Sequence, residues 1–460
     1  MDGALLEEVK SWIADDPDPI TAKRLQELLE ANDEAALRKL FNGFLTFGTA
    51  GLRGPIAPGP SGMNQLVVGR TAAAIAAYMK DRGLTDVVIG RDARYGSEEF
   101  TKISAEILSG AGMNVSVLPR PLPTPVLAHA IKYLNAHVGI MVTASHNPPM
   151  DNGYKVYLNS DCDGIKYRGS QIISPTDQLI SGEIAKITEL RRLPRANNWK
   201  VLNEDVFQDY VKETSKIGKT KHGLKIVYTA MHGVGLETVE AVFAKAGFPN
   251  LILVEAQAKP DPDFPTVSFP NPEEPGAIDL SIEKAKSVDA DLVIANDPDA
   301  DRCACAINDP IKGWRMLRGD ELGILLGDWI ARTNDGNYGN SIVSSSGLRK
   351  IAKHYGRHFQ ETLTGFKYLA QIPNLAFAYE EAIGYSVDSK TVADKDGVSA
   401  AIAIAELASE LAIHNQTLYD RLQEIWRMIG FHATEQISIR VSDIKLVKTI
   451  LDKLLNIKQI

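Results

Sequence analysis

The sequence has few cysteines and no long uninterrupted apolar run. Its 460 residues include only Cys162, Cys303 and Cys305, an odd number without metal-finger spacing, so a disulfide framework is not expected. This usage fits a reducing compartment, and we expect the protein in the cytoplasm. The most apolar stretches are broken by charges such as Asp328 and Glu406, and the amino terminus is acidic. The sequence therefore predicts neither a signal peptide nor a membrane span.

Positive charge is also in short supply. The chain carries 50 Lys and Arg against 58 Asp and Glu, a net charge of −8, which argues against a general nucleic-acid binder. Basic residues should instead gather locally around an anionic substrate. With 44% hydrophobic residues, the chain is long enough to form several cores, and we expect three or more domains.

Strand, loop and helix patterns recur along the chain and predict layered α/β domains. Such units place ligand-binding loops at the carboxyl ends of their strands, where one shared cleft can collect them. The predicted pairs are a strand at 86–92 with a helix capped by Ser97 and ending near Gly110, a strand at 224–228 with a helix ending near Gly247, and a strand at 341–344 with a helix from about Leu348.

Before the first of these units, residues 5–45 show helical spacing. Leu5, Val9 and Trp12 fall on one face, and a Pro-containing break lies at 16–19. This pattern predicts an amino-terminal helical lead-in.

The most informative segment is Thr-Ala-Ser-His-Asn-Pro at residues 143–148, which follows the apolar run 139–142. A hydroxyl at the end of a buried strand is here held on a loop that two successive prolines restrict. Ser145 thus suits phosphoryl transfer, with His146 and Lys155 nearby as proton-transfer or charge-stabilising groups. Ser, Asn and Pro are also common in surface turns for purely local reasons.

A second loop carries three alternating carboxylates. Residues 291–295 read as a buried strand that leads into Asp297, Asp299 and Asp301. Side chains at i, i+2 and i+4 converge on one face, and oxygen ligands without His or Cys suit Mg²⁺ rather than zinc. An EF-hand is excluded because its sixth position, which requires Gly, is Arg302. An acidic surface turn is the alternative, but clustered carboxylates repel one another unless a cation compensates.

These two segments resemble those of the alpha-D-phosphohexomutase superfamily, in its phosphoglucomutase and phosphopentomutase branch. Further matches are Phe-Gly-Thr-Ala-Gly-Leu-Arg-Gly at 47–54, Thr-Gly-Phe-Lys at 364–367 and Glu-Glu-Ala-Ile-Gly-Tyr at 380–385. The motifs fall in the family's order, and the similarity extends from about residue 41 to about residue 440.

The resemblance implies an intramolecular phosphotransferase that acts on a small sugar phosphate, with no nucleic-acid or membrane partner. The active form carries phosphate on Ser145 and passes through a sugar bisphosphate, which also serves as activator. Mg²⁺ is then held by the phosphoserine together with Asp297, Asp299 and Asp301.

The resemblance also implies roles for nearby basic residues. Lys155 matches the family's general acid/base, and His146 is the alternative because imidazole titrates near neutral pH. Arg53 and Arg302 match arginines beside the phosphoserine, where a guanidinium can bind phosphate oxygens in a bidentate way.

For the sugar, the resemblance implies binding by Glu381 and Lys367. The loop departs from the family's pattern, because Ile383 stands where hexose-specific relatives have Ser and Glu380 replaces a Gly. Glucose phosphate and ribose or deoxyribose phosphate therefore stay open as substrates. The charged turn at 394–397 has two interpretations, a ligand-facing turn or an exposed turn before a helix from about Val398, and we assign it no catalytic role.

The carboxyl end departs furthest from the family. Residues 436–440 resemble the first strand and 443–455 the first helix of a fourth domain, but its Arg-Pro-Ser-Gly-Thr-Glu-type phosphate loop does not follow. We therefore expect an α/β protein of three consecutive layered α/β domains around a shared cleft, with an incomplete fourth α+β domain. The predicted domains are 1–200, 201–310, 311–430 and 431–460, with linkers at 191–200 and 309–314 and a rigid Pro-rich surface loop at 260–275.

Two other functions remain as alternatives. A catalytically impaired homologue would act as a sugar-phosphate binding or interaction protein, in keeping with the missing phosphate loop. A metal-dependent phosphatase ranks last, because the sequence supplies no dedicated hydrolytic base.

Overall fold

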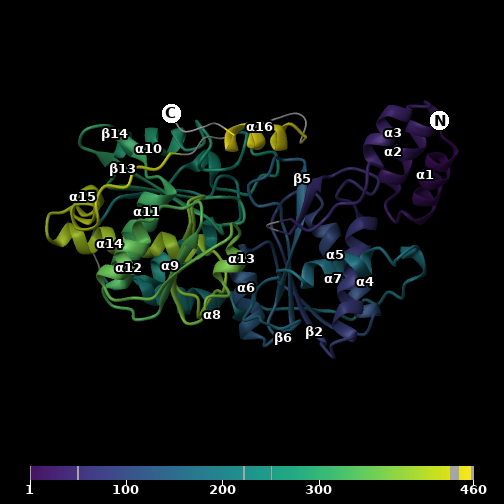
Figure 1. Ribbon diagram of the computed structural model, residues 1–460, viewed down its shortest axis with the longest axis horizontal. Coiled ribbons are helices and arrows are strands. Elements are labelled where there is room, and N and C mark those ends of the chain that lie inside the picture. The colour runs from purple at the N-terminus through teal and green to yellow at the C-terminus, as the bar shows by residue number, and fades with distance from the viewer. Residues whose placement is uncertain (1, 49–50, 221–222, 250, 436–444, 457–460) are drawn as a thin grey trace.

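The computed structural model describes residues 2–48, 51–220, 223–249, 251–435 and 445–456. Three sheets with their helices follow one another along the chain, and the amino-terminal helices lie at the far end of the molecule from the second and third sheets (Figure 1). The predicted layered α/β domains are thus confirmed. The boundaries at 200, 310 and 430 stay predictions. The strand predicted at 436–440 lies outside the described residues, and the helix predicted at 443–455 is described from its third residue, as α16 (Lys445–Leu455).

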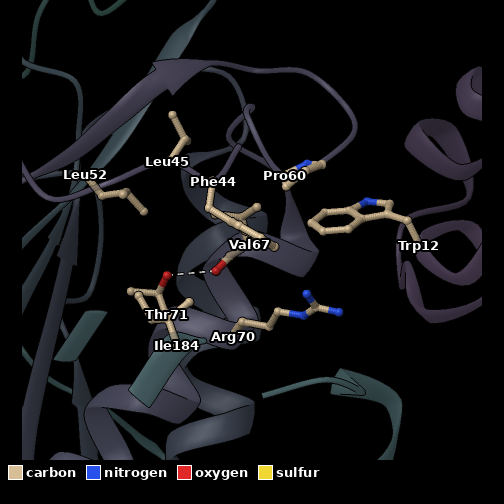
Figure 2. Close-up of a pocket in the computed structure, with 9 residues that line it drawn as sticks. All are labelled: Trp12, Phe44, Leu45, Leu52, Pro60, Val67, Arg70, Thr71 and Ile184. Carbon is tan, nitrogen blue, oxygen red and sulfur yellow. Dashed lines mark hydrogen bonds between the residues drawn. The ribbon is translucent and has the colours of Figure 1, made fainter. Parts of the chain in front are cut away.

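The predicted helical lead-in consists of α1 (Gly3–Asp15), α2 (Pro19–Glu30) and α3 (Glu34–Leu40). Each begins after an Asp whose carboxylate accepts a backbone N–H. The predicted apolar face of α1 is buried. Trp12 lies beside Phe44 and Pro60, with α4 (Gln65–Lys80) behind them (Figure 2). The Arg70 guanidinium lies 5.0 Å from the indole ring, so the lead-in packs on the first domain.

The first sheet has the order β1-β5-β4-β2-β3-β9, with β8 paired to β5. Its strands are β1 (Leu52–Pro55), β2 (Asp86–Arg91), β3 (Asn114–Val117), β4 (Val138–Val142), β5 (Asp151–Leu158), β8 (Ser170–Gln171) and β9 (Lys200–Val201), and a small hairpin is formed by β6 (Asp161–Cys162) and β7 (Ile165–Lys166). Its helices, besides α4, are α5 (Ser97–Gly110), α6 (Thr124–Tyr133) and α7 (Thr176–Ile184), followed by η1 (Leu190–Arg192).

Alternation along these strands separates two apolar clusters. Val87 and Ile89 join the cluster of α1, α4 and α5. Val88 and Met141 join the cluster of α6, which continues into the second and third domains. One prediction about α5 is wrong: its N-cap is a left-handed glycine that precedes Ser97, and the Ser97 hydroxyl donates instead to a carboxylate at the end of β2.

The second sheet has the order β11-β10-β12-β13-β14. Its strands are β10 (Ile226–Thr229), β11 (Ile252–Leu253), β12 (Leu292–Asn296), β13 (Cys303–Asp309) and β14 (Gly313–Met316), and its helices are α8 (Asp205–Thr214), η2 (Ser215–Ile217), α9 (Leu236–Ala246), η3 (Glu255–Gln257) and α10 (Asp279–Val288). The segment predicted as a linker at 309–314 contains the turn of the β13–β14 hairpin.

The third sheet has the order β16-β15-β17-β18. Its strands are β15 (Asn337–Ser341), β16 (Phe359–Thr362), β17 (Leu375–Glu380) and β18 (Gly384–Ser386), and its helices are α11 (Gly319–Ala331), α12 (Gly347–His354), α13 (Phe366–Leu369), α14 (Gly397–Ile413) and α15 (Leu418–Ile429). The strand predicted at 341–344 was placed too late, because the backbone turns there and Ser344 N–H donates to the Ser341 carbonyl.

No single helix in the described ranges is long and apolar enough to cross a membrane. The consecutive pair α14 and α15 meets the length and composition criterion only when both helices are combined, and they meet at a bend of 91°.

Candidate active site

Ser145 lies just beyond β4 in a left-handed turn, with φ of 53°, a conformation uncommon for residues other than Gly. Its N–H donates to Thr143 Oγ1 over 2.9 Å, and that hydroxyl donates to Asp92 Oδ2 over 2.6 Å. The Ser145 hydroxyl donates to Asp297 Oδ2 over 2.7 Å and lies 3.2 Å from His146 Nδ1. The fold thus brings the predicted nucleophile against the predicted metal loop.

The three carboxylates predicted to bind metal, those of Asp297, Asp299 and Asp301, are all buried on the loop after β12. One carboxylate oxygen of each lies within 4.8 Å of the others. Oδ1 of Asp299 and Oδ1 of Asp301 are buried without a hydrogen-bonding partner, although buried polar atoms are normally paired. Orphaned lone pairs in an all-oxygen cluster fit a hard divalent cation.

The pKa values of two carboxyls in the cluster, Asp297 and Asp301, shift in opposite directions. Burial, followed by repulsion from the two neighbouring carboxylates, raises the pKa of Asp297 well above its ordinary value. Burial also opposes ionisation of Asp301, but Lys155, Lys395 and Arg302 outweigh it and lower the pKa of that carboxyl. A bound cation would favour the ionised form of every member.

Lys155 occupies the middle of β5, opposite Met141 of β4. Because side chains alternate along a strand, Lys155 leaves the sheet on the face turned toward the second domain. Its ammonium is fully buried and donates to Asp299 Oδ2 over 2.6 Å and to Asp301 Oδ2 over 2.8 Å. The predicted acid/base therefore belongs to the same cluster as the carboxylates.

His146 is the neighbour of the nucleophile. Burial, with Arg302 and Arg53 adding positive charge nearby, lowers the pKa of His146 well below its ordinary value. Its imidazole is therefore neutral at neutral pH and can form a hydrogen bond with Ser145 Oγ.

Two further residues support the carboxylates: Thr124, which the sequence does not single out, and Lys395, which lies in the charged turn at 394–397. Thr124, at the start of α6, donates its hydroxyl to Asp299 Oδ2 over 2.6 Å. Lys395 places its ammonium 3.4 Å from Asp301 Oδ2. The interpretation of 394–397 as an exposed turn is wrong, because these side chains are buried and are bonded to the first and second domains. The Pro-Thr-Pro sequence at 123–125, where α6 begins, is the only sequence signal for Thr124, and a weak one.

The predicted arginines flank these loops. Arg53 lies on β1, beside β5, and its Nη1 is 3.4 Å from Asn147 Oδ1 in the serine loop. Arg302 follows the carboxylate loop, and its backbone N–H donates to Asp297 Oδ1 over 3.0 Å. The Arg302 guanidinium lies 3.6 Å from Glu273, and its Nε is buried without a hydrogen bond.

Glu381 lies directly after β17, as the predicted sugar loop requires. Its Oε2 accepts from Ser341 Oγ over 2.9 Å and from Ser344 Oγ over 2.8 Å, while its own N–H donates to Ser344 Oγ over 3.0 Å. Its second oxygen, Oε1, accepts no hydrogen bond from the described residues. One carboxylate oxygen is thus fixed by the two serine hydroxyls.

The same loop is tied to its neighbours. Glu380 Oε1 accepts the Gly365 N–H over 2.7 Å, which joins the two third-domain motifs. Ile383 is fully buried with φ of 53°, an outlier for a β-branched residue, and its carbonyl accepts the N–H of Cys303 at the start of β13. Its side chain therefore serves the core.

Lys367 reaches from the third domain to the first. Its ammonium donates to the Gly48 carbonyl over 3.3 Å and lies 4.0 Å from Asp177. Within the predicted segment 47–54, residues 49 and 50 lie outside the described residues. Lys367 therefore meets the described start of that segment.

Comparison with known proteins identifies the domains. Models of the phosphoglucomutase/phosphomannomutase alpha/beta/alpha domains match in succession: domain I at residues 45–191, domain II at 205–313 and domain III at 318–429.

Individual proteins show the same likeness. The chain is 46% identical over 402 residues to a probable phosphomannomutase of Haemophilus influenzae, covering 86% of this chain and 82% of that protein. It is 38% identical over 481 residues to a phosphopentomutase of Mus musculus, covering 94% and 75%. A phosphoglucomutase/phosphomannomutase family protein of Burkholderia thailandensis shares the fold, with a TM-score of 0.68 at 22% identity over 83% of this chain and 79% of that one. The chain therefore belongs to the phosphoglucomutase/phosphomannomutase family, in the alpha-D-phosphohexomutase superfamily, and is an isomerase of sugar phosphates.

Proposed function

We propose that this enzyme interconverts a sugar 1-phosphate with the 6-phosphate of glucose or the 5-phosphate of a pentose, through phosphorylated Ser145 and a sugar bisphosphate. One observation carries the proposal: the Ser145 hydroxyl lies 2.7 Å from Asp297, in contact with a buried carboxylate cluster that has orphaned oxygens. A phosphate on that hydroxyl would lie beside the cation that the cluster fits.

In the proposed cycle, the free hydroxyl of the sugar phosphate attacks the phosphorus of phosphorylated Ser145. The bond from phosphorus to the serine oxygen breaks and a sugar ester forms, while the proton of the sugar hydroxyl passes by way of Lys155 or His146 to the released serine oxygen. The bisphosphate then reverses its orientation and returns its other phosphoryl group to Ser145. One phosphate ester forms for each that breaks, and the phosphoserine is regenerated.

The chain's own residues would position the reacting groups. Asp297, Asp299 and Asp301 would hold Mg²⁺, which when bound supplies positive charge to the transferring phosphoryl oxygens. Arg53 and Arg302 would bind phosphate oxygens through their guanidinium groups. Fixed charges in a buried site stabilise a transition state without having to reorganise. Electrostatic stabilisation by these groups is therefore the main source of catalysis.

For the sugar, Oε1 of Glu381 would accept hydrogen bonds from ring hydroxyls, and Lys367 would help to place the substrate. The names of the relatives, phosphomannomutase and phosphopentomutase, support both hexose and pentose phosphates. A panel of glucose, mannose, ribose and deoxyribose 1-phosphates, measured by coupled assay with Mg²⁺ and glucose 1,6-bisphosphate, would rank them by kcat/KM.

Phosphoryl labelling tests the nucleophile. With ³²P-labelled glucose 1,6-bisphosphate and Mg²⁺, the native enzyme should take up label and Ser145→Ala should take up none. Ser346→Ala, which alters an exposed serine without a side-chain cap bond, should label like the native enzyme. Label that persists in Ser145→Ala would overturn the assignment. Folded native protein that binds sugar phosphates without turnover would support the binding role instead, and release of free phosphate would support a phosphatase.

A further inference from the structure

The Pro-rich segment at 260–275 was predicted to be a rigid surface loop, but part of it is buried against the first domain. Phe264 is 2% exposed, and its ring centre lies 4.9 Å from the Arg94 guanidinium carbon. Beside it, the Tyr95 hydroxyl donates to Asp263 Oδ1 over 2.9 Å. The description as a surface excursion is therefore wrong for this part of the segment, which packs on the loop after β2.

Arg94 in turn holds the loop that carries the nucleophile. Its Nη2 donates to the Ser145 carbonyl over 2.6 Å and to the Asn147 carbonyl over 2.7 Å. Its Nη1 donates to the Pro148 carbonyl over 2.8 Å and to the Asp151 carbonyl over 3.2 Å. One planar guanidinium thus binds three carbonyls of the irregular loop and that of Asp151 at the start of β5, a geometry that the single ammonium of Lys does not reproduce.

The support of Arg94 comes from both domains. From the first domain, Asp92 Oδ2 lies 3.4 Å from Arg94 Nε, and the same carboxylate is fixed by the Thr143 and Ser97 hydroxyls. From the second domain, the face of Phe264 covers the guanidinium, a favourable contact for a buried cation. Phe264 has φ of 47°, which is unusual for a bulky residue and requires surroundings that hold it there.

The far end of the segment reaches the carboxylate loop. Glu273 Oε2 lies 3.6 Å from Arg302 Nη1, and the Arg302 N–H donates to Asp297. Residues 260–275 therefore contact both Arg94, which binds the serine loop, and Arg302, which is bonded to the carboxylate loop.

We propose that residues 260–275 position the phosphoryl-transfer site, with Phe264 fixing Arg94 and Arg94 fixing the backbone that carries Ser145. This inference rests on the proposed function. Phe264 and Arg94 are positioning residues, since they act through the loop rather than on substrate. Transfer requires alignment of the serine oxygen, and a displacement of about 1 Å can reduce a rate by about 100-fold.

The test compares two Phe→Leu variants. Phe264→Leu keeps an apolar side chain but removes the ring that covers Arg94, while Phe248→Leu changes another buried phenylalanine of the second domain, one that packs on Phe243 instead. We expect Phe264→Leu to lower kcat by about 10- to 100-fold with KM within two-fold, and Phe264→Tyr to restore most of kcat. Phe248→Leu should lower thermal stability and leave kcat unchanged.

Hydrogen exchange supplies a second readout. In Phe264→Leu, backbone amides of 143–152 should exchange faster than in the native enzyme, whereas in Phe248→Leu they should not. If Phe264→Leu fails to fold, Tyr95→Phe takes its place. This change to an exposed side chain removes only the bond to Asp263 and should lower kcat by about five-fold.

Equal kcat values in the native enzyme and Phe264→Leu would overturn the inference, and so would equal losses of kcat in Phe264→Leu and Phe248→Leu. If Tyr95→Phe is used because Phe264→Leu does not fold, an unchanged kcat in Tyr95→Phe would overturn it. Absence of ³²P labelling in the native enzyme would instead overturn the proposed function. The two failures are therefore distinguishable.

Discussion

Removal of one hydroxyl, in Ser344→Ala, should weaken sugar recognition without touching the serine or the carboxylate loop. The Ser344 hydroxyl donates to Glu381 Oε2 and accepts from the Glu381 N–H. Without it, the carboxylate keeps only the bond from Ser341 and gains rotational freedom. Oε1 would then no longer be held ready for a ring hydroxyl.

The size of the effect follows from the type of bond. A hydrogen bond to a charged group contributes about 1.5–3 kcal/mol, and the lower value applies because Glu381 is only partly buried. A loss of about 1.5 kcal/mol corresponds to a roughly ten-fold lower kcat/KM. The Mg²⁺ concentration for half-maximal activity should stay within two-fold, since Ser344 contacts none of the three aspartates.

A double-mutant cycle tests whether Ser344 acts through Glu381. Steady-state kinetics on the preferred sugar 1-phosphate would compare Ser344→Ala, Glu381→Gln and the double variant, with Ser346→Ala as the control on the same loop. If Ser344 acts through Glu381, adding Ser344→Ala to Glu381→Gln should lower kcat/KM by no more than about two-fold. Fully additive losses, or a ten-fold loss in Ser346→Ala, would refute the assignment.

Two further predictions concern other parts of the molecule. Thr124→Val removes the hydroxyl that orients Asp299 and should weaken Mg²⁺ binding by about ten-fold, measured by calorimetric titration of the metal, whereas Thr124→Ser should bind normally; equal affinities in both would contradict the role. Asp15→Asn should lower the free energy of unfolding by about 1.5–3 kcal/mol at pH 7, measured by urea denaturation. Burial would raise the pKa of Asp15, but the N–H groups of Arg191 and Leu190, with Arg70, hold it below its ordinary value. The stabilisation is therefore present above about pH 4 and is lost as pH falls through the folded-state pKa, so a difference that persists undiminished at pH 2 would contradict the explanation.

Local patterns were enough to predict the parts that depend on local physics. Apolar runs indicated the buried strands β4 and β12, and helical spacing put Leu5, Val9 and Trp12 on one buried face. The loops that follow these strands were found because a serine shortly before two successive prolines, and carboxylates at i, i+2 and i+4, are unusual in sequence. Each of these signals is contained in a short stretch of neighbouring residues.

Local patterns in the chain establish which groups are present, namely a serine on a tight loop, an alternating carboxylate triad, and layered domains that present loops at strand ends. Which of these groups touch depends on how distant segments pack. Thr124 and Asp299, Arg94 and Phe264, and Ser344 and Glu381 are separated by 175, 170 and 37 positions, and the buried turn at 394–397 looks in sequence like any exposed charged turn. No local period encodes such pairs, because the free energy that holds them arises only when segments far apart in the chain pack together and exclude water from the polar groups between them.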